Sequence, residues 1–285
     1  MVIKNVDGIP FQLREKQNFD WLHDLGKVFC VFDQQDSGNL CFGVEKDGER
    51  QFIKYAGART LDYDGDTEDA VNQLKEAVTV YEELRHPNLV ELRTHFIVED
   101  GYAAVFEWFD GEGLHPHWEF PPPEKYTHPD SPFYRYRQLP VKRRLASLDE
   151  IFTFHAFVES RGYVAIDFYD GSILYDFQNN RTRICDIDMY CKKPFINQMG
   201  RMWGSSRFMS PEEFQLEAPI DEKTNVFNMG ATTFVLLGGG VNRSFSKWEA
   251  GKELYEVARR AVEADRDERY PSVAAFYTAW KGRIS

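Results

Sequence analysis

The chain has 285 residues, with 34 Lys and Arg against 46 Asp and Glu, and a formal net charge of −12. Aromatic residues make up 15% of the sequence, which excludes the disordered class because disordered chains contain few aromatic residues. The acidic balance also disfavours nucleic-acid binding, since Lys and Arg supply most of the affinity for phosphates. A length of this order suggests one large domain or two modest ones.

The four cysteines form neither a CxxC pair nor a metal-ligand pattern, and we interpret them as reduced thiols. Residues 1–8 lack the apolar segment typical of a secretory signal. The longest apolar stretch, near residues 227–241, contains polar residues and three successive glycines and is too short for a membrane span. We therefore expect a cytoplasmic protein without a membrane partner.

Residues 20–109 are predicted to form mainly β-strands. Short runs of β-branched and aromatic residues occupy residues 28–32, 40–44 and 51–55, and turn-forming residues separate them. A helix is predicted to begin at Asp66 or Thr67, because apolar residues then recur about every 3.6 positions. These apolar residues are Val71, Leu74, Val78, Tyr81 and Leu84. Two further strands are predicted at residues 92–98 and 102–108.

The remainder of the chain consists of a proline-rich part followed by a part with helical patterns. Residues 115–140 are rich in proline, which disfavours a regular helix or a central strand and predicts a loop or lid. From residue 145 onward helices are predicted, at residues 148–159, 225–237, 249–264 and 272–281, with a hairpin at residues 173–185. We therefore expect two lobes: residues 1–109 with a five-stranded sheet and one helix, an insertion at residues 110–144, and a helical segment at residues 145–285.

The front segment resembles the start of a protein kinase. Gly38 precedes a strand, and Lys54 ends the Phe52-Ile53-Lys54 run on the next strand. In protein kinases a lysine at this place holds the α- and β-phosphates of ATP and pairs with a glutamate on the following helix. The resemblance assigns the first role to Lys54. Counting back from residues 84–90, which resemble the kinase segment after that helix, it assigns the second role to Glu76.

The same resemblance implies further contacts with the nucleotide. Gly38 and Leu40 lie where the phosphate loop meets its second strand. Glu107 and Phe109 bound the predicted hinge between the lobes. ATP is the implied cofactor.

Two aspartates occupy the positions of catalytic carboxylates. Residues 161–174 resemble the kinase catalytic loop, with Asp167 as the base that orients an incoming hydroxyl and accepts its proton. Residues 185–188 resemble the metal-binding segment, in which Asp186 would hold Mg²⁺. Ser172 stands where the family has a metal-binding Asn, and Asp170 and Asp188 are further candidate ligands.

The back segment carries the remaining kinase-like motifs. Residues 204–212 resemble the end of an activation segment, and in the family its last glutamate, here Glu212, forms a buried ion pair with an arginine, here Arg269. Residues 221–230 resemble the start of the next helix. The motifs follow in order from about residue 28 to 281, so the resemblance implies an α+β, bilobal, protein kinase-like fold. Its N-lobe would be rich in β-strands and its C-lobe mainly helical.

Several positions depart from the family pattern. Asp33 and Gln35 replace glycines of the phosphate loop, and Tyr169 replaces a catalytic-loop lysine. Ile166 replaces the arginine that receives an activating phosphate, so activation by phosphorylation of residues 205–206 is not expected. Asn225 replaces an aspartate that braces the catalytic loop.

These features predict an ATP- and Mg²⁺-dependent phosphotransferase, most simply one that acts on Ser or Thr hydroxyls. Three alternatives stay open: a pseudokinase that acts as a binding or regulatory module, a kinase of small hydroxyl-bearing molecules, and a nucleotidyl transferase. A basic and aromatic patch between Arg135 and Arg144 is a candidate contact for a protein or small-molecule acceptor.

Overall fold

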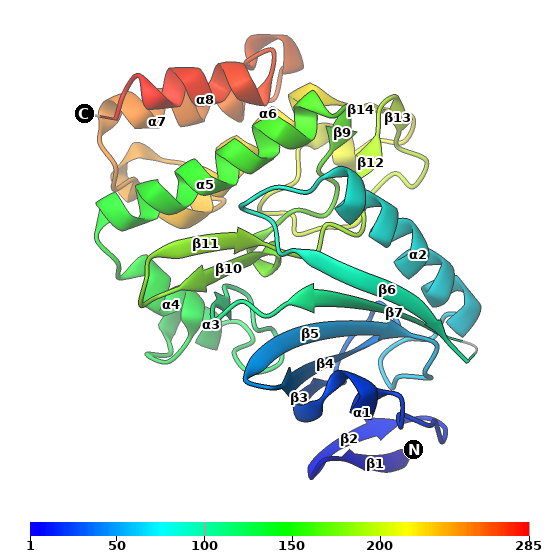
Figure 1. Cartoon of the computed structure of the whole chain (residues 1–285). Helices are drawn as coiled ribbons and strands as arrows, with labels where there is room; N and C mark the ends of the chain where they lie inside the picture. Colours follow the sequence, from blue (N-terminus) through cyan, green and yellow to red (C-terminus); the bar gives the residue numbers. More distant parts are fainter. Residues whose placement is uncertain (100, 285) are drawn as a thin grey trace. The chain divides into compact units, whose positions relative to one another are not determined.

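The computed structural model describes residues 1–99 and 101–284 as an α+β structure with several antiparallel sheets (Figure 1). Ser285, the last residue of the predicted helical segment, lies outside the described residues. The chain forms two compact units, Met1–Phe109 and Asp110–Ser285. The proline-rich residues 115–140 therefore belong to the second unit.

A five-stranded antiparallel sheet of order β3-β4-β5-β7-β6 is the centre of the first unit. Its strands are β3 (Lys27–Phe32), β4 (Asn39–Lys46), β5 (Glu49–Ala56), β6 (Leu92–Val98) and β7 (Gly101–Glu107). The five strands predicted from the sequence are thus confirmed. They form because β-branched and aromatic side chains suit a pleated sheet with two buried faces.

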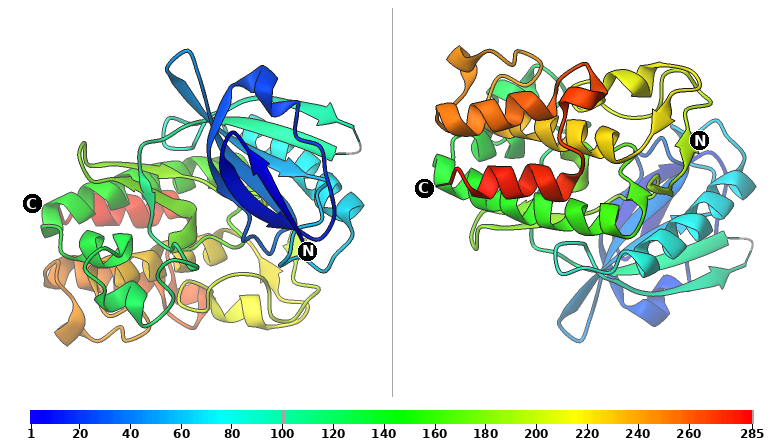
Figure 2. Two further views of the ribbon diagram at one scale, coloured as in Figure 1. Left: turned by 90° about the horizontal axis from the view of Figure 1, so that it is seen from below. Right: turned by 90° about the horizontal axis from the view of Figure 1, so that it is seen from above.

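The two faces of this sheet are covered by different elements (Figure 2). Helix α2 (Thr67–Glu83), capped by the Asp66 side chain as predicted, packs against β5, β6 and β7. On the other face lie α1 (Leu22–Leu25) and a hairpin of β1 (Val2–Val6) and β2 (Ile9–Leu13), which the sequence analysis did not predict. A hydrophobic cluster fills the space between hairpin and sheet, and Phe11 stands edge-on to Phe42 at 5.9 Å.

Four long helices build the second unit: α5 (Val141–Ser160), α6 (Glu222–Leu237), α7 (Lys252–Ala261) and α8 (Val273–Lys281). All four were predicted, although α5 begins seven residues earlier than residue 148. The Phe152 ring of α5 contacts Phe276 and Trp280 of α8 at 5.1 and 5.6 Å. Within the described part of the chain, none of the helices has the length and apolarity to cross a membrane.

Short elements connect these helices. The predicted hairpin is formed by β10 (Ile173–Asp176) and β11 (Arg181–Ile184), and β8 (Glu112–Gly113) adds a third strand. Two small pairs join β9 (Tyr163–Val164) to β12 (Cys191–Lys192) and β13 (Phe195–Ile196) to β14 (Pro219–Ile220). The 3₁₀ turns are Asp170–Ser172, Pro211–Phe214, Phe245–Lys247 and Arg266–Glu268.

The proline-rich insertion is more ordered than the predicted loop. It contains two short helices, α3 (Glu124–Thr127) and α4 (Pro132–Arg137). Helix α4 begins at Pro132, where proline is tolerated because the first helical position has no hydrogen bond to lose. The Ser131 side chain caps it by accepting a hydrogen bond from the backbone N–H of Tyr134.

Candidate active site

Lys54 lies in the middle of β5, opposite Cys41 of β4 and Ala104 of β7. Its neighbours Ile53 and Tyr55 belong to the hydrophobic cluster under the hairpin. Because successive side chains of a strand point to opposite faces, Lys54 lies on the face that α2 covers. The lysine is 9% exposed.

Glu76 occupies the exposed side of α2. The buried side of the helix consists of Ala70, Val71, Leu74, Ala77, Val78 and Tyr81. Helix α2 therefore turns apolar residues toward the sheet, and the pairing of Glu76 with Lys54 stays a prediction.

Leu40, a predicted nucleotide contact, lies on the face of the sheet opposite Lys54. Leu40 is fully buried and pairs with Tyr55 across the strands, so it lies in the hydrophobic cluster, on the face opposite Lys54. Cys41, one residue later, shares the face of Lys54. A shift of one residue in a strand moves a side chain to the other face, and the sequence motif alone did not define that register.

Gly38 is required by close packing of the chain. Its φ is +77°, and a Cβ atom at this position would lie 2.8 Å from the Tyr63 ring. Asp33, at the other end of the β3–β4 loop, accepts a hydrogen bond from the backbone N–H of Gln12 at 2.8 Å. The Asp33 carboxylate therefore ties this loop to the N-terminal hairpin.

Glu107 and Phe109, the predicted hinge residues, end the first unit. The Glu107 carboxylate accepts a hydrogen bond from the backbone N–H of Glu91 at 3.2 Å, and the Glu107 N–H donates to the Glu91 carbonyl at 2.9 Å. These bonds fix the end of β7 against the chain that enters β6. Phe109 is half-buried.

In the second unit, Asn225 braces the loop that carries Asp167. The Asn225 side-chain oxygen accepts from the backbone N–H of Ala165 at 2.9 Å, and its amide nitrogen donates to the Tyr163 carbonyl at 3.1 Å. Asn225 is 1% exposed and lies in the first turn of α6. An amide can both accept and donate, so Asn225 can hold two backbone groups of the loop at once.

Asp167 and Asp186 share an unusual backbone conformation. Their φ values are +63° and +54°, in the left-handed region that few residues other than glycine adopt. The charges of both carboxylates act on the same two phenols. Burial, and then the charges of Asp186 and Asp167, raise the pKa of Tyr169 above its ordinary value. The pKa of Tyr190 is raised by burial and by the same two carboxylates.

A buried histidine packs against the loop that carries Asp167. The His155 Nδ1–H donates to the Ile151 carbonyl at 2.8 Å, which leaves Nε2 to accept from the Tyr190 hydroxyl at 2.8 Å. The His155 ring lies 4.3 Å from the ring of Phe168, the residue after Asp167. The sequence analysis missed this histidine because it lies on α5, outside the catalytic-loop motif.

Ser172 and Asp186 are brought together by the β10–β11 hairpin. The Ser172 carbonyl accepts from the backbone N–H of Cys185 at 3.0 Å. The Ser172 hydroxyl is buried and has no hydrogen-bond partner in the described part of the chain. Asp186 is exposed and Asp188 is half-buried. Among residues 1–99 and 101–284, no group of three or more His, Cys, Asp or Glu side chains is placed to hold a metal ion.

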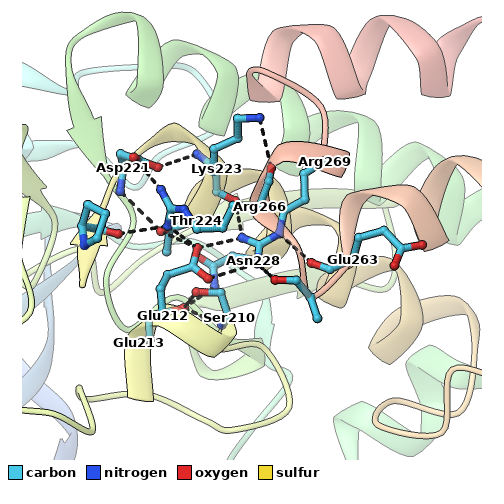
Figure 3. Close-up of polar contacts among 12 residues, drawn as sticks. Ser210, Glu212, Glu213, Asp221, Lys223, Thr224, Asn228, Glu263, Arg266 and Arg269 are labelled. Carbon is cyan, nitrogen blue, oxygen red and sulfur yellow. Dashed lines mark hydrogen bonds and ion pairs between the residues drawn. The ribbon is translucent and has the colours of Figure 1, made fainter. Parts of the chain in front are cut away.

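Glu212 and Arg269 form the predicted buried ion pair (Figure 3). The two guanidinium nitrogens donate to the two carboxylate oxygens at 2.7 and 3.0 Å. Thr224 and Arg266 also bind this carboxylate. Burial alone would raise the pKa of Glu212, but the bonds and charge of Arg269 lower it below its ordinary value. The pair joins the 3₁₀ turn Pro211–Phe214 to the chain before α8.

The segment that ends at Glu212 also approaches Asp167. A Cβ atom at Gly204, whose φ is +127°, would lie 3.5 Å from an Asp167 carboxylate oxygen. Met202 and Met209 pack in one hydrophobic cluster with Ile166, the residue before Asp167. The segment around residues 202–209 and the loop that carries Asp167 are therefore in direct contact.

Asp170 forms a second buried charge cluster, which the sequence did not predict. Arg207 donates to both of its carboxylate oxygens, at 2.9 and 2.8 Å, and the Lys125 ammonium donates at 2.6 Å. The Lys125 ammonium also contacts His115 Nδ1. Burial lowers the pKa of Lys125 to about 8, with Arg207 contributing and Asp170 opposing. Burial and the charge of Lys125 lower the pKa of His115 to about 4.

Most of the basic patch at residues 135–144 is engaged inside the second unit. Arg137 and Arg144 donate to the carbonyls of Val235 and Leu236, at 3.2 and 3.1 Å, and both pair with Glu249. These carbonyls belong to the last turn of α6, where carbonyl groups lack helical partners. Arg135 pairs with Glu112, whereas Arg143 is exposed.

Comparison of the chain with protein-family models and with curated proteins found no match. Function must therefore be inferred from the residues and contacts within the two units. Lys54 belongs to the first unit, and Asp167, Asp186 and Ser172 belong to the second.

Proposed function

We propose that the protein is an ATP- and Mg²⁺-dependent phosphotransferase of the protein kinase-like superfamily, with a bilobal fold and with Ser or Thr hydroxyls as the simplest acceptors. The observations that carry this proposal are that Asp167 and Asp186 both have a left-handed backbone conformation and that both raise the pKa of Tyr169. These carboxylates lie 19 positions apart in the sequence. Each has a left-handed backbone conformation, and such conformations are typical of functional sites.

Asp167 has the surroundings of a positioned base. Its loop is held by Asn225 on one side and by the packing of Phe168 on His155 on the other. In phosphoryl transfer the enzyme mostly positions the groups, and the base orients the acceptor hydroxyl and takes its proton. Asp167 would perform this step. Lys54 would bind the phosphates of ATP.

Tyr169, where protein kinases have a lysine, would act through a hydrogen bond and not through charge. Burial and the nearby carboxylates raise its pKa, so the phenol stays neutral at physiological pH. A neutral phenol can donate to a phosphate oxygen.

The donor atoms near Asp186 are suited to Mg²⁺. This ion prefers oxygen ligands and commonly takes one or two carboxylates, while phosphates and water complete its shell. Asp186 offers an exposed carboxylate, and the buried Ser172 hydroxyl is without a partner in the described residues. When bound, Mg²⁺ would offset the negative charge of the phosphates.

The test is phosphoryl transfer from Mg²⁺-ATP to peptide libraries and to small hydroxyl compounds by the wild type and by Asp167→Asn. We expect transfer by the wild type and a loss of at least 1000-fold in kcat for the variant, because an amide cannot accept the proton; base catalysis typically contributes about 10²–10⁴-fold. ATP affinity should stay within about twofold.

Asp47→Asn is a matched control, since Asp47 also has a positive φ of 55° but lies in the exposed β4–β5 turn. Asparagine tolerates this conformation as well as aspartate does, so this variant should keep full activity. Undiminished transfer by Asp167→Asn would remove Asp167 as the base.

A second candidate function is a pseudokinase that serves as a binding module. It is favoured by the β3–β4 loop, which Asp33 ties to Gln12 and which packs at Gly38 against Tyr63. Phosphate loops need backbone N–H groups that are free to approach the phosphates. If neither ATP binding nor transfer is detected, this candidate is favoured.

A further inference from the structure

The Asp170 cluster joins three segments of the second unit. Asp170 follows Asp167 by three residues, Arg207 belongs to the activation segment, and Lys125 belongs to α3 of the insertion. The side chains of Asp170 and Lys125 are both 0% exposed. Removing two cations and one carboxylate from water costs free energy. Direct hydrogen bonds between the charged groups can offset this cost. Here the geometry does so, since each cation donates directly to Asp170.

The cluster has the function that an activating phosphate would have, which is to order the segment. A phosphate orders such a segment by pairing with arginine, but residue 166 of the catalytic loop is isoleucine and is buried with Met202 and Met209. In this chain the charges are reversed: the loop supplies the anion, Asp170, and the segment supplies the guanidinium, Arg207. The planar guanidinium makes two hydrogen bonds to one carboxylate, which restricts its orientation.

The insertion completes the arrangement. Lys125 is held by Asp170, by His115 and by packing 4.8 Å from the Phe133 ring. The Ser131 hydroxyl donates to the Lys125 carbonyl at 2.7 Å, so the same serine that caps α4 also fixes α3. The insertion is therefore anchored on the catalytic loop through one buried ion pair.

We propose that Asp170, Lys125 and Arg207 are positioning residues: they hold the activation segment against the Asp167 loop in the active arrangement, so that this cluster, completed by Lys125 of the insertion, does what a phosphate on residues 205–206 would otherwise do. This inference rests on the proposed function for its catalytic consequence, while its structural consequence can be measured independently. The insertion is then an integral activating element and not a substrate lid.

The test combines hydrogen exchange with kinetics on Lys125→Met and Arg207→Met in the full chain. Each variant leaves one cation paired with Asp170, so no lone buried carboxylate is created. We expect backbone exchange in residues 200–210 to rise at least tenfold in Arg207→Met, and exchange in residues 112–130 and 165–172 to rise at least tenfold in Lys125→Met. Exchange in α6 and α8 should stay within twofold of the wild type.

Kinetics separate positioning from a general loss of stability. Both variants should lower kcat at least tenfold with the KM for ATP unchanged, and Arg207→Lys, which keeps the charge but not the two-bond fork, should recover part of the loss. Lys252→Met and Arg259→Met remove exposed cations from α7, which carries no residue of the cluster, and serve as matched controls. The double variant Ser205→Ala/Ser206→Ala should behave as the wild type.

Exchange in residues 200–210 within twofold of the wild type in Arg207→Met would overturn the proposal, whether or not the protein transfers phosphate. A wild type without transfer, combined with the expected exchange pattern, would overturn the proposed function and leave the cluster as a lock on a binding module. A drop in kcat in the Ser205→Ala/Ser206→Ala variant would also contradict the proposal, because a phosphate would then be needed.

Discussion

At the scale of single residues, the buried carboxylates of this protein differ in what surrounds them. Glu212 is paired with Arg269, and its pKa is lowered despite burial. Glu213, the next residue, is 1% exposed and accepts hydrogen bonds from three neutral donors, the Ser210 N–H, the Ser210 hydroxyl and the Asn228 amide. Burial therefore dominates and raises the pKa of Glu213 to about 7. Two adjacent glutamates thus have opposite effects on the pH dependence of stability.

The raised pKa of Glu213 predicts that the protein becomes less stable as the pH rises. Its pKa is about 7 in the folded state against the ordinary value of 4.5, so between these values the folded state binds more protons than the unfolded state. The free energy of unfolding then falls with rising pH. Each unit of pKa shift corresponds to 1.36 kcal/mol, which gives a penalty of up to about 3 kcal/mol above pH 7.

Glu213→Gln should remove this penalty, because all three donors bind one oxygen, Oε2, that an amide oxygen can replace. We expect the variant to match the wild type near pH 4.5 and to be more stable by up to about 3 kcal/mol at pH 8. Urea unfolding across this pH range measures the difference, and the exposed Glu119→Gln is the control. A constant difference at every pH would show that the Glu213 carboxyl is not responsible.

At the scale of elements, α6 is the central helix of the second unit. All its residues from Thr224 to Leu237 are buried. Its Asp221 cap binds Arg266, and its first and last turns each bind another segment. A helix that is buried on all sides forms through tertiary packing more than through an amphipathic pattern. The same burial lets Asn225 hold the loop that carries Asp167.

The contact between α6 and α7 depends on Gly230. A Cβ atom there would lie 2.7 Å from Ala261 Cβ and 2.8 Å from Val262 Cγ1. Gly230→Ala should therefore force the helices apart and lower the free energy of unfolding by about 1–3 kcal/mol. Guanidinium chloride unfolding measures this change.

Gly282→Ala is the matched control, since the nearest atoms to its Cβ lie at 3.6 Å. An alanine at a compatible position stabilises by about 0.4–1 kcal/mol. If both variants have the same stability, the close approach of the two helices at Gly230 is not a constraint.

At the scale of the whole molecule, the two units each carry part of the proposed site. Lys54 belongs to Met1–Phe109, and Asp167 and Asp186 belong to Asp110–Ser285. A ligand that needs both units should stabilise the chain only when the residues of both are intact. Thermal unfolding tests this requirement without an acceptor.

We expect saturating Mg²⁺-ATP to raise the Tm by several degrees, since a ligand at 100 times its Kd stabilises by about 2.7 kcal/mol. Lys54→Ala and Asp186→Asn should each abolish most of the shift. Lys142→Ala and Asp47→Asn, at exposed positions, should preserve it. No shift in the wild type would favour the pseudokinase reading, and an unaltered shift in Asp186→Asn would remove its proposed role at the metal.

The sequence by itself determined the elements with a clear local period. The strands of the first sheet, α2 with its Asp66 cap and the four helices of the second unit follow from spacings of two and about 3.6 residues, which neighbouring residues establish. The Glu212–Arg269 pair was predicted from a resemblance in motif order. The N-terminal hairpin and the short helices of the insertion were missed, because a few residues give too short a pattern to distinguish from a loop.

Only the tertiary structure decided which side chains meet across the chain. Asp170 contacts Lys125 and Arg207, 45 and 37 residues away, and His155 contacts Tyr190, 35 residues away. Strand register placed Leu40 in the core and Cys41 beside Lys54. Such contacts depend on how whole elements pack. The residues next to a charged or aromatic side chain in the sequence do not indicate which distant residue it will contact.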